Sequence, residues 1–274
     1  MALACPITQL IEETLLDLLS PEKFPEGMLG AAARYATLGG GKRLRPRLVM
    51  ATAEIYNIPP EVSIIPACVI ELIHTYSLIH DDLPCMDNDD FRRGKPSLHK
   101  AYPEAHALLT GDFLLTYAFE ILSKAPHLSD GQKIALITTL SERAGAHGMI
   151  GGQECDIASV GQKISWETLL FIHKRKTADL ITAAIEFGGI LGNSPQMDLL
   201  TTIGQEAGLA FQILDDLSDT DDLIQERPSA VTLLGKENAK TYAETLTHSA
   251  LSHLQSLPAP YLEILLKEIL AHSS

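Results

Sequence analysis

Several signals that would place a chain in other classes are missing from this sequence. It has only four cysteines, at positions 5, 68, 85 and 155, and no CxxC pair, so free thiols in a reducing compartment are expected rather than disulfides. The opening residues MALAC contain neither the charged segment nor the apolar core of a secretory signal. No apolar run is expected to reach the ~18 to 20 residues that a membrane-spanning helix needs. These absences predict a cytoplasmic protein.

Charged residues are scarce, and basic ones especially so. Only 20% of the residues are charged whereas 46% are hydrophobic, which argues against intrinsic disorder. Lysine and arginine number 21 against 35 acidic residues, giving a formal net charge of −14 with neutral histidine. Nucleic acid is a poor partner for such a chain. Much of the acidity lies in two clusters that bound metal would partly neutralise, so the charge does not indicate a basic partner.

Strand-like patterns are absent as well. Nowhere do apolar and polar residues alternate over the length of a strand, and there is no nucleotide-binding glycine fingerprint, internal repeat or low-complexity tract. Apolar residues instead recur with helical spacing and without an evident linker. The sequence therefore predicts an all-α fold, one domain over residues 1–274, with about ten helices in a single large bundle around a deep central cavity.

The apolar spacing also predicts where individual helices lie. The first begins at Pro6 and carries Glu12, Glu13 and Asp17 on its outer side. Glycines 39–41 should end the second helix, and glycines 148, 151 and 152 should allow close helix packing or an approach to substrate. Further helices are expected over residues 27–37, 104–124, 132–150, 166–189 and 203–217.

A first acidic cluster follows an apolar helix. The helical pattern climbs from residue 66 to residue 79 and delivers Asp81 and Asp82 at its end. Pro84 cannot continue a helix, because its ring lacks the N–H and clashes one turn back. Asp87 therefore returns on a loop and can converge with Asp81, which an unbroken helix would not allow.

Cations and hard oxygen ligands lie together in this cluster. Clustered carboxylates with no Cys/His pairing nearby favour Mg²⁺ over zinc. Arg92, Arg93 and Lys95 follow at once, and metal ions together with cations are expected for a polyphosphate substrate. Lys42, Arg45 and their basic neighbours after the glycines allow two interpretations, an ordinary helix surface or a second phosphate site.

A second acidic cluster lies more than a hundred residues further on. Gln212, Asp215, Asp216 and Asp219 are spaced i, i+3, i+4 and i+7, which places them on one helix face. A solvated face is the alternative, but the helix over residues 203–217 is too apolar and too rich in Gly and Ala for a surface helix. The two clusters together predict two sets of ligands for one group of metals.

Three stretches together resemble the signature regions of trans-isoprenyl diphosphate synthases. They are GGGKRLRP at 39–46, HDDLPCMDNDDFRRGKP at 80–96 and FQILDDLSD at 211–219. The similarity extends from about residue 35 to about residue 225 and is closest to the short-chain farnesyl and geranylgeranyl type. It implies the isoprenoid synthase bundle and a homodimer.

The resemblance also implies a role for each site residue. Three Mg²⁺ ions would be held by Asp81, Asp87 and Asp215, with Asp82, Asp216 and Asp219 close by. Isopentenyl diphosphate would be bound by Lys42, Arg45, His74 and Arg93, and the allylic diphosphate by Arg92 and Lys176. The Thr177 hydroxyl and the Gln212 amide oxygen would face the allylic cation, and Tyr76 would form the floor of the chain-length pocket or, alternatively, merely fill the core.

The implied activity is head-to-tail condensation of isopentenyl diphosphate with dimethylallyl and geranyl diphosphates, giving farnesyl diphosphate. Geranylgeranyl diphosphate synthesis is one alternative. A terpene cyclase is another, although it would not need the second diphosphate site. A third is a weakly active or non-catalytic partner subunit, because the stretch TDDLIQERPSAVTLLG lacks the family's Gly-Lys pair and has Arg227 roughly where a later lysine is usual.

Overall fold

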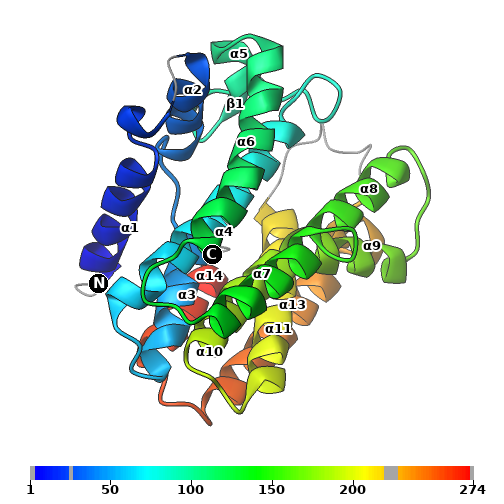
Figure 1. Ribbon diagram of the computed structural model, residues 1–274. Coiled ribbons are helices and arrows are strands. Elements are labelled where there is room, and N and C mark those ends of the chain that lie inside the picture. Colours follow the sequence, from blue (N-terminus) through cyan, green and yellow to red (C-terminus); the bar gives the residue numbers. More distant parts are fainter. Residues whose placement is uncertain (1–3, 25–26, 219–227, 272–274) are drawn as a thin grey trace. The chain divides into compact units, whose positions relative to one another are not determined.

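The protein is described by a computed structural model that covers residues 4–24, 27–218 and 228–271 (Figure 1). The chain divides into two compact units, of which the first comprises residues 1–50 and 60–137, and the second comprises residues 51–59 and 138–274. In the described part of the chain the elements are helices apart from one short hairpin, so the predicted all-α class is confirmed. The single domain stays a prediction.

The first unit contains the glycine run and the first aspartate cluster. Its central helix is α4, which begins at Pro60, a favoured first position for proline, and packs against α6 and α1. The elements are α1 (Ala4–Leu18), the 3₁₀ turn η1 (Pro21–Lys23), α2 (Met28–Thr37), α3 (Leu44–Ile55, which runs into the second unit), α4 (Pro60–Asp81), β1 (Phe91–Arg92), β2 (Lys95–Pro96), α5 (Leu98–Ala101), α6 (Glu104–Ser123) and α7 (Asp130–Ala144, also shared).

Helix α4 is more apolar than expected. By length and composition alone it is long and apolar enough for a membrane span, so the expectation that no apolar run reaches that length is wrong. Of its most apolar window, 72% is buried inside the protein, and the buried residues include Val69, Leu72 and Ile73. Such burial is what a central core helix requires, because nearly every face of it is covered by neighbours.

The second unit is organised around α11, which runs beside α10 and α13 (Figure 1). Gly204 and Gly208 of α11 let this helix pack closely against the segment that contains Ala178 and Thr182. A Cβ added at Gly204 would lie 2.7 Å from the Thr182 Cα, and one added at Gly208 would lie 2.6 Å from the Ala178 Cα. The elements are α8 (Met149–Ser159), α9 (Trp166–His173), the π-helical segment η2 (Lys174–Ala178), α10 (Asp179–Leu191), α11 (Met197–Ser218), α12 (Ala230–Leu234), α13 (Lys236–Leu254) and α14 (Pro260–Ala271).

Two predicted helices are divided in the structure. The helix expected over residues 132–150 ends at Ala144, and α8 begins at Met149 and includes Gly151 and Gly152. Gly148 makes this break, because a Cβ there would lie 1.9 Å from the Arg143 carbonyl oxygen. The helix expected over residues 166–189 is interrupted by the π-helical turn of η2. The second interruption contains the predicted site residues Lys176 and Thr177.

Candidate functional site

The first aspartate cluster begins where α4 ends. The backbone N–H of Asp82 still donates to the Leu78 carbonyl at 3.1 Å, and the chain then turns through Pro84. The N–H of Asp87 donates to the carbonyl of Asp81 at 2.8 Å. The proline break therefore returns Asp87 to the end of the helix, as the sequence predicts.

Asp82 is held by Arg92 within this cluster. The carboxylate is 2% exposed, and it accepts hydrogen bonds from Arg92 Nε at 2.9 Å and Nη2 at 2.5 Å. Arg92 Nη2 also donates to Asp89 at 2.8 Å. Burial raises the pKa of the Asp82 carboxyl against the opposing effect of Arg92. The pair fixes the guanidinium of Arg92, which the sequence assigns to the allylic diphosphate.

A tight hairpin carries Arg93. The strands pair Arg92 with Lys95, so Arg93 and Gly94 are the two turn residues, with φ of +53° and +76°. Two positive φ values in a two-residue loop are typical of a type I′ turn. Gly41 lies against this arginine, since a Cβ added there would be 3.0 Å from Arg93 Cζ. The glycine run therefore makes room for the hairpin.

Arg45, Arg93 and His74 form a group with positive charge and unused donors. Among the described residues, Arg45 Nε and Arg93 Nη1 are buried without a hydrogen-bond partner. Burial, with the nearby Arg93, lowers the pKa of Arg45 to about 10. Burial, followed by Arg45 and Arg93, holds the pKa of His74 well below its usual range, so this imidazole is neutral. Such a group has spare N–H donors for an anion. Lys42, the fourth predicted ligand, lies exposed in the preceding loop.

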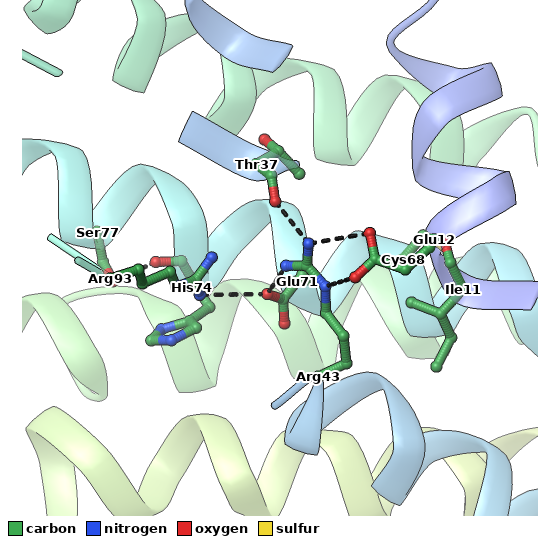
Figure 2. Close-up of polar contacts among 9 residues, drawn as sticks. All are labelled: Ile11, Glu12, Thr37, Arg43, Cys68, Glu71, His74, Ser77 and Arg93. Carbon is green, nitrogen blue, oxygen red and sulfur yellow. Dashed lines mark hydrogen bonds and ion pairs between the residues drawn. The ribbon is translucent and has the colours of Figure 1, made fainter. Parts of the chain in front are cut away.

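Arg43 does not lie where the sequence suggests. The sequence allowed a helix surface or a phosphate site for this basic run, whereas Glu12, expected on the outer side of the first helix, is partly exposed at 39% of its side chain. The Arg43 side chain is instead buried, where it is ion-paired with Glu12 and Glu71 (Figure 2). A cation inside the protein needs such partners. Arg43 is thus not available at the surface.

The predicted catalytic residues of the second unit lie together. Thr177 Oγ1 donates to Gln212 Oε1 at 2.7 Å, joining η2 to α11. Lys176 Nζ, one residue earlier on η2, donates to Asp156 Oδ2 of α8 at 2.5 Å. Gly152 backs this segment so closely that an added Cβ would lie 2.3 Å from the Lys176 backbone nitrogen. π-Helical turns of this kind are frequent at functional sites.

The second aspartate cluster is only partly within the described residues. Asp215 and Asp216 lie on α11, one helical turn after Gln212, and Asp219 and Arg227 are outside the described residues. Asp216 accepts hydrogen bonds from Gln212 Nε2 at 3.0 Å and from the Ala230 backbone N–H at 2.6 Å. This carboxylate therefore also ties α11 to the start of α12.

The predicted aspartate ligands can be compared with the coordination that Mg²⁺ prefers. Within the described residues, no group of three or more His, Cys, Asp or Glu side chains is gathered closely enough to hold a metal ion. Mg²⁺ commonly keeps several waters and takes only one or two carboxylates, with substrate phosphates supplying the rest. Asp81 and Asp87 in the first unit, and Asp215 in the second, carry oxygen ligands of that kind. Their assignment to Mg²⁺ stays a prediction.

Tyr76 is a buried residue of α4, five positions before Asp81. It is 4% exposed, and its ring and the His80 ring lie edge to face with centroids 5.8 Å apart. Its hydroxyl has no hydrogen-bond partner in the described part of the chain, and burial raises the pKa of Tyr76 to about 12. Gly111 of α6 admits His80, because an added Cβ would lie 2.0 Å from the imidazole Nε2. The chain-length role of Tyr76 stays a prediction.

Three polar residues at these sites were assigned no role from the sequence. Glu71 accepts bonds from Arg43 and Arg93, and Asp156 binds Lys176. Both amide atoms of Gln153 are buried without a partner among the described residues. Each could have been found from the sequence as a charged or amide side chain inside an apolar or glycine-rich helix. Such a group, when buried, needs a polar partner. Glu71 shows this most clearly, since it stands between Ile70 and Leu72.

Comparisons with known proteins extend over most of the chain. The sequence profile of the polyprenyl synthetase family matches residues 26–226. Farnesyl diphosphate synthase of Haemophilus influenzae is 42% identical over 245 residues, which cover 83% of this chain and 82% of that protein. A solved FPP/GFPP synthase from Zymomonas mobilis, an apo structure, has a TM-score of 0.92 and 39% identity, covering 98% of both chains. A geranyltransferase from Helicobacter pylori, complexed with magnesium and isoprenyl diphosphate, has a TM-score of 0.85 and 35% identity, covering 99% of this chain and 96% of that one.

Proposed function

Since the chain belongs to the polyprenyl synthetase family and is a short-chain trans-prenyltransferase, we propose that it condenses isopentenyl diphosphate head-to-tail with dimethylallyl and geranyl diphosphates. Farnesyl diphosphate is the proposed product. Geranylgeranyl diphosphate is the alternative, because the similar proteins include enzymes named for different product lengths. The enzyme is further proposed to be a cytoplasmic homodimer with one catalytic domain.

One observation carries the proposal for two diphosphate substrates. Arg45 and Arg93 retain buried N–H donors without partners, among the described residues, around His74, in addition to the Arg92 and Asp82 pair of the aspartate cluster. An anion at the first group would satisfy donors that otherwise cost free energy when buried. A terpene cyclase has no use for this second anion site, which favours a prenyltransferase.

Mg²⁺ is the proposed cofactor, with three ions held by Asp81, Asp87 and Asp215 and with Asp82, Asp216 and Asp219 close by. A solved structure similar to this chain is complexed with magnesium, which supports the choice of ion. When bound, the ions neutralise the charge that builds on the departing pyrophosphate.

Arg92 and Lys176 are proposed to bind the allylic diphosphate. Each is already oriented by a carboxylate, Asp82 in one case and Asp156 in the other. Lys42, Arg45, His74 and Arg93 are proposed to bind isopentenyl diphosphate. The neutral imidazole of His74 would contribute a hydrogen bond rather than a charge.

Thr177 and Gln212 are proposed to face the carbon that becomes positive. Because the Thr177 hydroxyl donates its hydrogen bond to Gln212 Oε1, the lone pairs of the hydroxyl oxygen are left for a cationic carbon. The C–O bond to the allylic diphosphate breaks, and the double bond of isopentenyl diphosphate forms the new C–C bond. The released pyrophosphate then takes the proton lost from the adduct.

The test is incubation of the pure protein with dimethylallyl and isopentenyl diphosphates and Mg²⁺, followed by chromatography. A longer prenyl diphosphate with pyrophosphate supports the proposal. A hydrocarbon indicates a cyclase, and no product indicates a non-catalytic subunit.

Asp81→Ala and Asp215→Ala extend this test to the metal ligands. Each is expected to lower turnover by several orders of magnitude while the circular dichroism spectrum of the folded protein is kept. Near-normal activity of either pure variant would contradict the assignment of both aspartates to metal.

A further inference from the structure

Each nitrogen of the Arg43 guanidinium donates a hydrogen bond within the protein. The residue is 2% exposed. Its Nε donates to Glu12 Oε1 at 2.6 Å and its Nη1 to Glu71 Oε1 at 2.6 Å (Figure 2). Its Nη2 donates to Glu12 Oε2 at 3.2 Å and to the Thr37 carbonyl oxygen at 2.7 Å. An arginine with every nitrogen bonded in this way has little left to offer a phosphate, although it lies in the basic run beside Arg45.

The backbone at Arg43 is in a costly conformation. Its φ is +48°, and Gly40 and Gly41, which precede Lys42, have φ of +98° and +126°. A non-glycine residue in the left-handed region persists only where the surroundings over-determine it. At Arg43, the hydrogen bonds to Glu12, Glu71 and Thr37 hold the residue in this conformation. This geometry separates Arg43, whose donors are used, from Arg45, whose buried Nε has no partner among the described residues.

Glu71 connects Arg43 to a predicted substrate ligand. It is 2% exposed on α4, and the same Oε1 that accepts from Arg43 also accepts from Arg93 Nη2 at 3.4 Å (Figure 2). Arg93 thereby has one nitrogen directed at Glu71 and another, Nη1, buried without a partner in the described part of the chain. The carboxylate therefore orients the guanidinium without using all of its donors.

The charges explain why Arg43 is needed. Glu71 is a buried carboxylate, which must be paired, whereas the Glu12 side chain is 39% exposed. Arg43 is ion-paired with both carboxylates. Its contact with Glu71 is the shorter one, at 2.6 Å, whereas Arg93 contacts Glu71 at 3.4 Å. Without Arg43, Arg93 would be the one cation left to Glu71 among the ion pairs of the described residues.

We propose that Arg43, Glu71 and Glu12 are positioning residues that hold Arg93 ready for the diphosphate of isopentenyl diphosphate. Through these contacts, α1, the glycine loop, α4 and the hairpin together fix the orientation of the Arg93 guanidinium. The inference rests on the proposed function, since it assigns Arg93 to that substrate.

Glu71→Gln is the principal test, because it removes the charge and keeps the size. The KM for isopentenyl diphosphate is expected to rise about tenfold or more, as for a small misplacement of a binding group, while the KM for dimethylallyl diphosphate stays within about twofold. Glu12→Gln, at the more exposed partner of Arg43, is expected to give a smaller change of the same kind. Glu13→Gln removes a neighbouring exposed charge from α1 and is expected to change neither constant.

A double variant separates positioning from folding. If Glu71 acts through Arg93, then adding Glu71→Gln to Arg93→Ala changes the KM for isopentenyl diphosphate little further. A purely structural role would lower the melting temperature and the active fraction but leave both KM values unchanged, and that result overturns the inference.

Calorimetric binding of isopentenyl diphosphate without Mg²⁺ distinguishes the two proposals. If the wild type is active and binds isopentenyl diphosphate with the same affinity as Glu71→Gln, the positioning network is contradicted but the proposed function is not. A wild-type protein that neither binds nor turns over isopentenyl diphosphate contradicts both proposals.

Discussion

His74 is a histidine that its surroundings keep neutral. It lies on α4 among arginines, and burial followed by Arg45, Arg93, Arg92 and Arg43 holds its pKa well below the usual range. Below about pH 6.5 the unfolded chain takes up a proton at this residue, whereas the folded protein does not. The free energy of unfolding therefore falls as the pH decreases through that range.

The variant His74→Gln should remove this contribution. We expect its melting temperature to fall less steeply than that of the wild type as the pH is lowered from about 7 to about 5, because no proton is taken up at position 74 on unfolding. Thermal melts followed by circular dichroism measure the difference. His248→Gln removes an exposed histidine of α13 and is the control. Parallel pH profiles for wild type and His74→Gln would contradict the assignment of a neutral buried imidazole.

At the scale of elements, η2 is the segment whose conformation most directly sets the site. Its π-helical turn carries Lys176 and Thr177, and its backbone lies against Gly152 of α8. A Cβ at position 152 would be 2.3 Å from the Lys176 nitrogen and 2.8 Å from the Arg175 carbonyl carbon. Since both atoms belong to the backbone, a side-chain rotation cannot relieve the overlap.

Gly152→Ala should therefore displace η2. We expect a loss of about 1 to 3 kcal/mol of stability, as for overpacking in a core, together with a fall in kcat because Lys176 and Thr177 move. Gly131→Ala in α7 is the matched control, since an added Cβ there meets no atom within 4 Å, and it should be neutral or stabilise by up to about 1 kcal/mol. Denaturant unfolding and steady-state kinetics measure both. Wild-type kcat in Gly152→Ala would show that the close packing is not needed for activity.

Helix α4 carries a second element-scale prediction through Tyr76. At ~1.5 Å per residue this side chain lies ~7.5 Å below Asp81 along the helix, the depth at which a growing chain anchored by its diphosphate would meet it. Tyr76→Ala is expected to shift the product from C15 towards C20 or longer while activity is kept. If Tyr76 only fills the core, the variant instead loses about 3 kcal/mol or more of stability with unchanged product length. Chromatography of the dephosphorylated products distinguishes these outcomes.

The sequence predicts these elements unevenly, for physical reasons. The all-α class and the turn after Asp81 follow from local properties, apolar spacing of 3.6 residues and a proline that cannot donate. The π-helical turn at Lys176 depends on the approach of Gly152, which local spacing does not contain. Arg43 looks like its basic neighbours, and its burial depends on Glu12 and Glu71, 31 and 28 residues away along the chain.

For the molecule as a whole, the formal net charge of −14 contrasts with a site that binds anions. The contrast is resolved if the excess of acidic groups includes carboxylates that hold metal, because Mg²⁺ and diphosphate then bind as a neutralising pair. A ligand that binds only the folded protein stabilises it by about 2.7 kcal/mol at a hundredfold excess over its Kd. For a chain of this size, each kcal/mol of added stability typically raises the melting temperature by ~2 to 4 °C.

Inorganic pyrophosphate with Mg²⁺ should therefore raise the melting temperature by about 5 to 10 °C, whereas either component alone should have a smaller effect. Asp81→Asn should remove most of the increase that depends on both, because it takes away a proposed metal ligand. Asp17→Asn, at a side chain that is 73% exposed on α1, removes the same charge and should leave the increase intact. Differential scanning fluorimetry measures all of these shifts. An equal increase from pyrophosphate without Mg²⁺ would mean that arginines and lysines alone bind the anion, and that the aspartates serve another purpose.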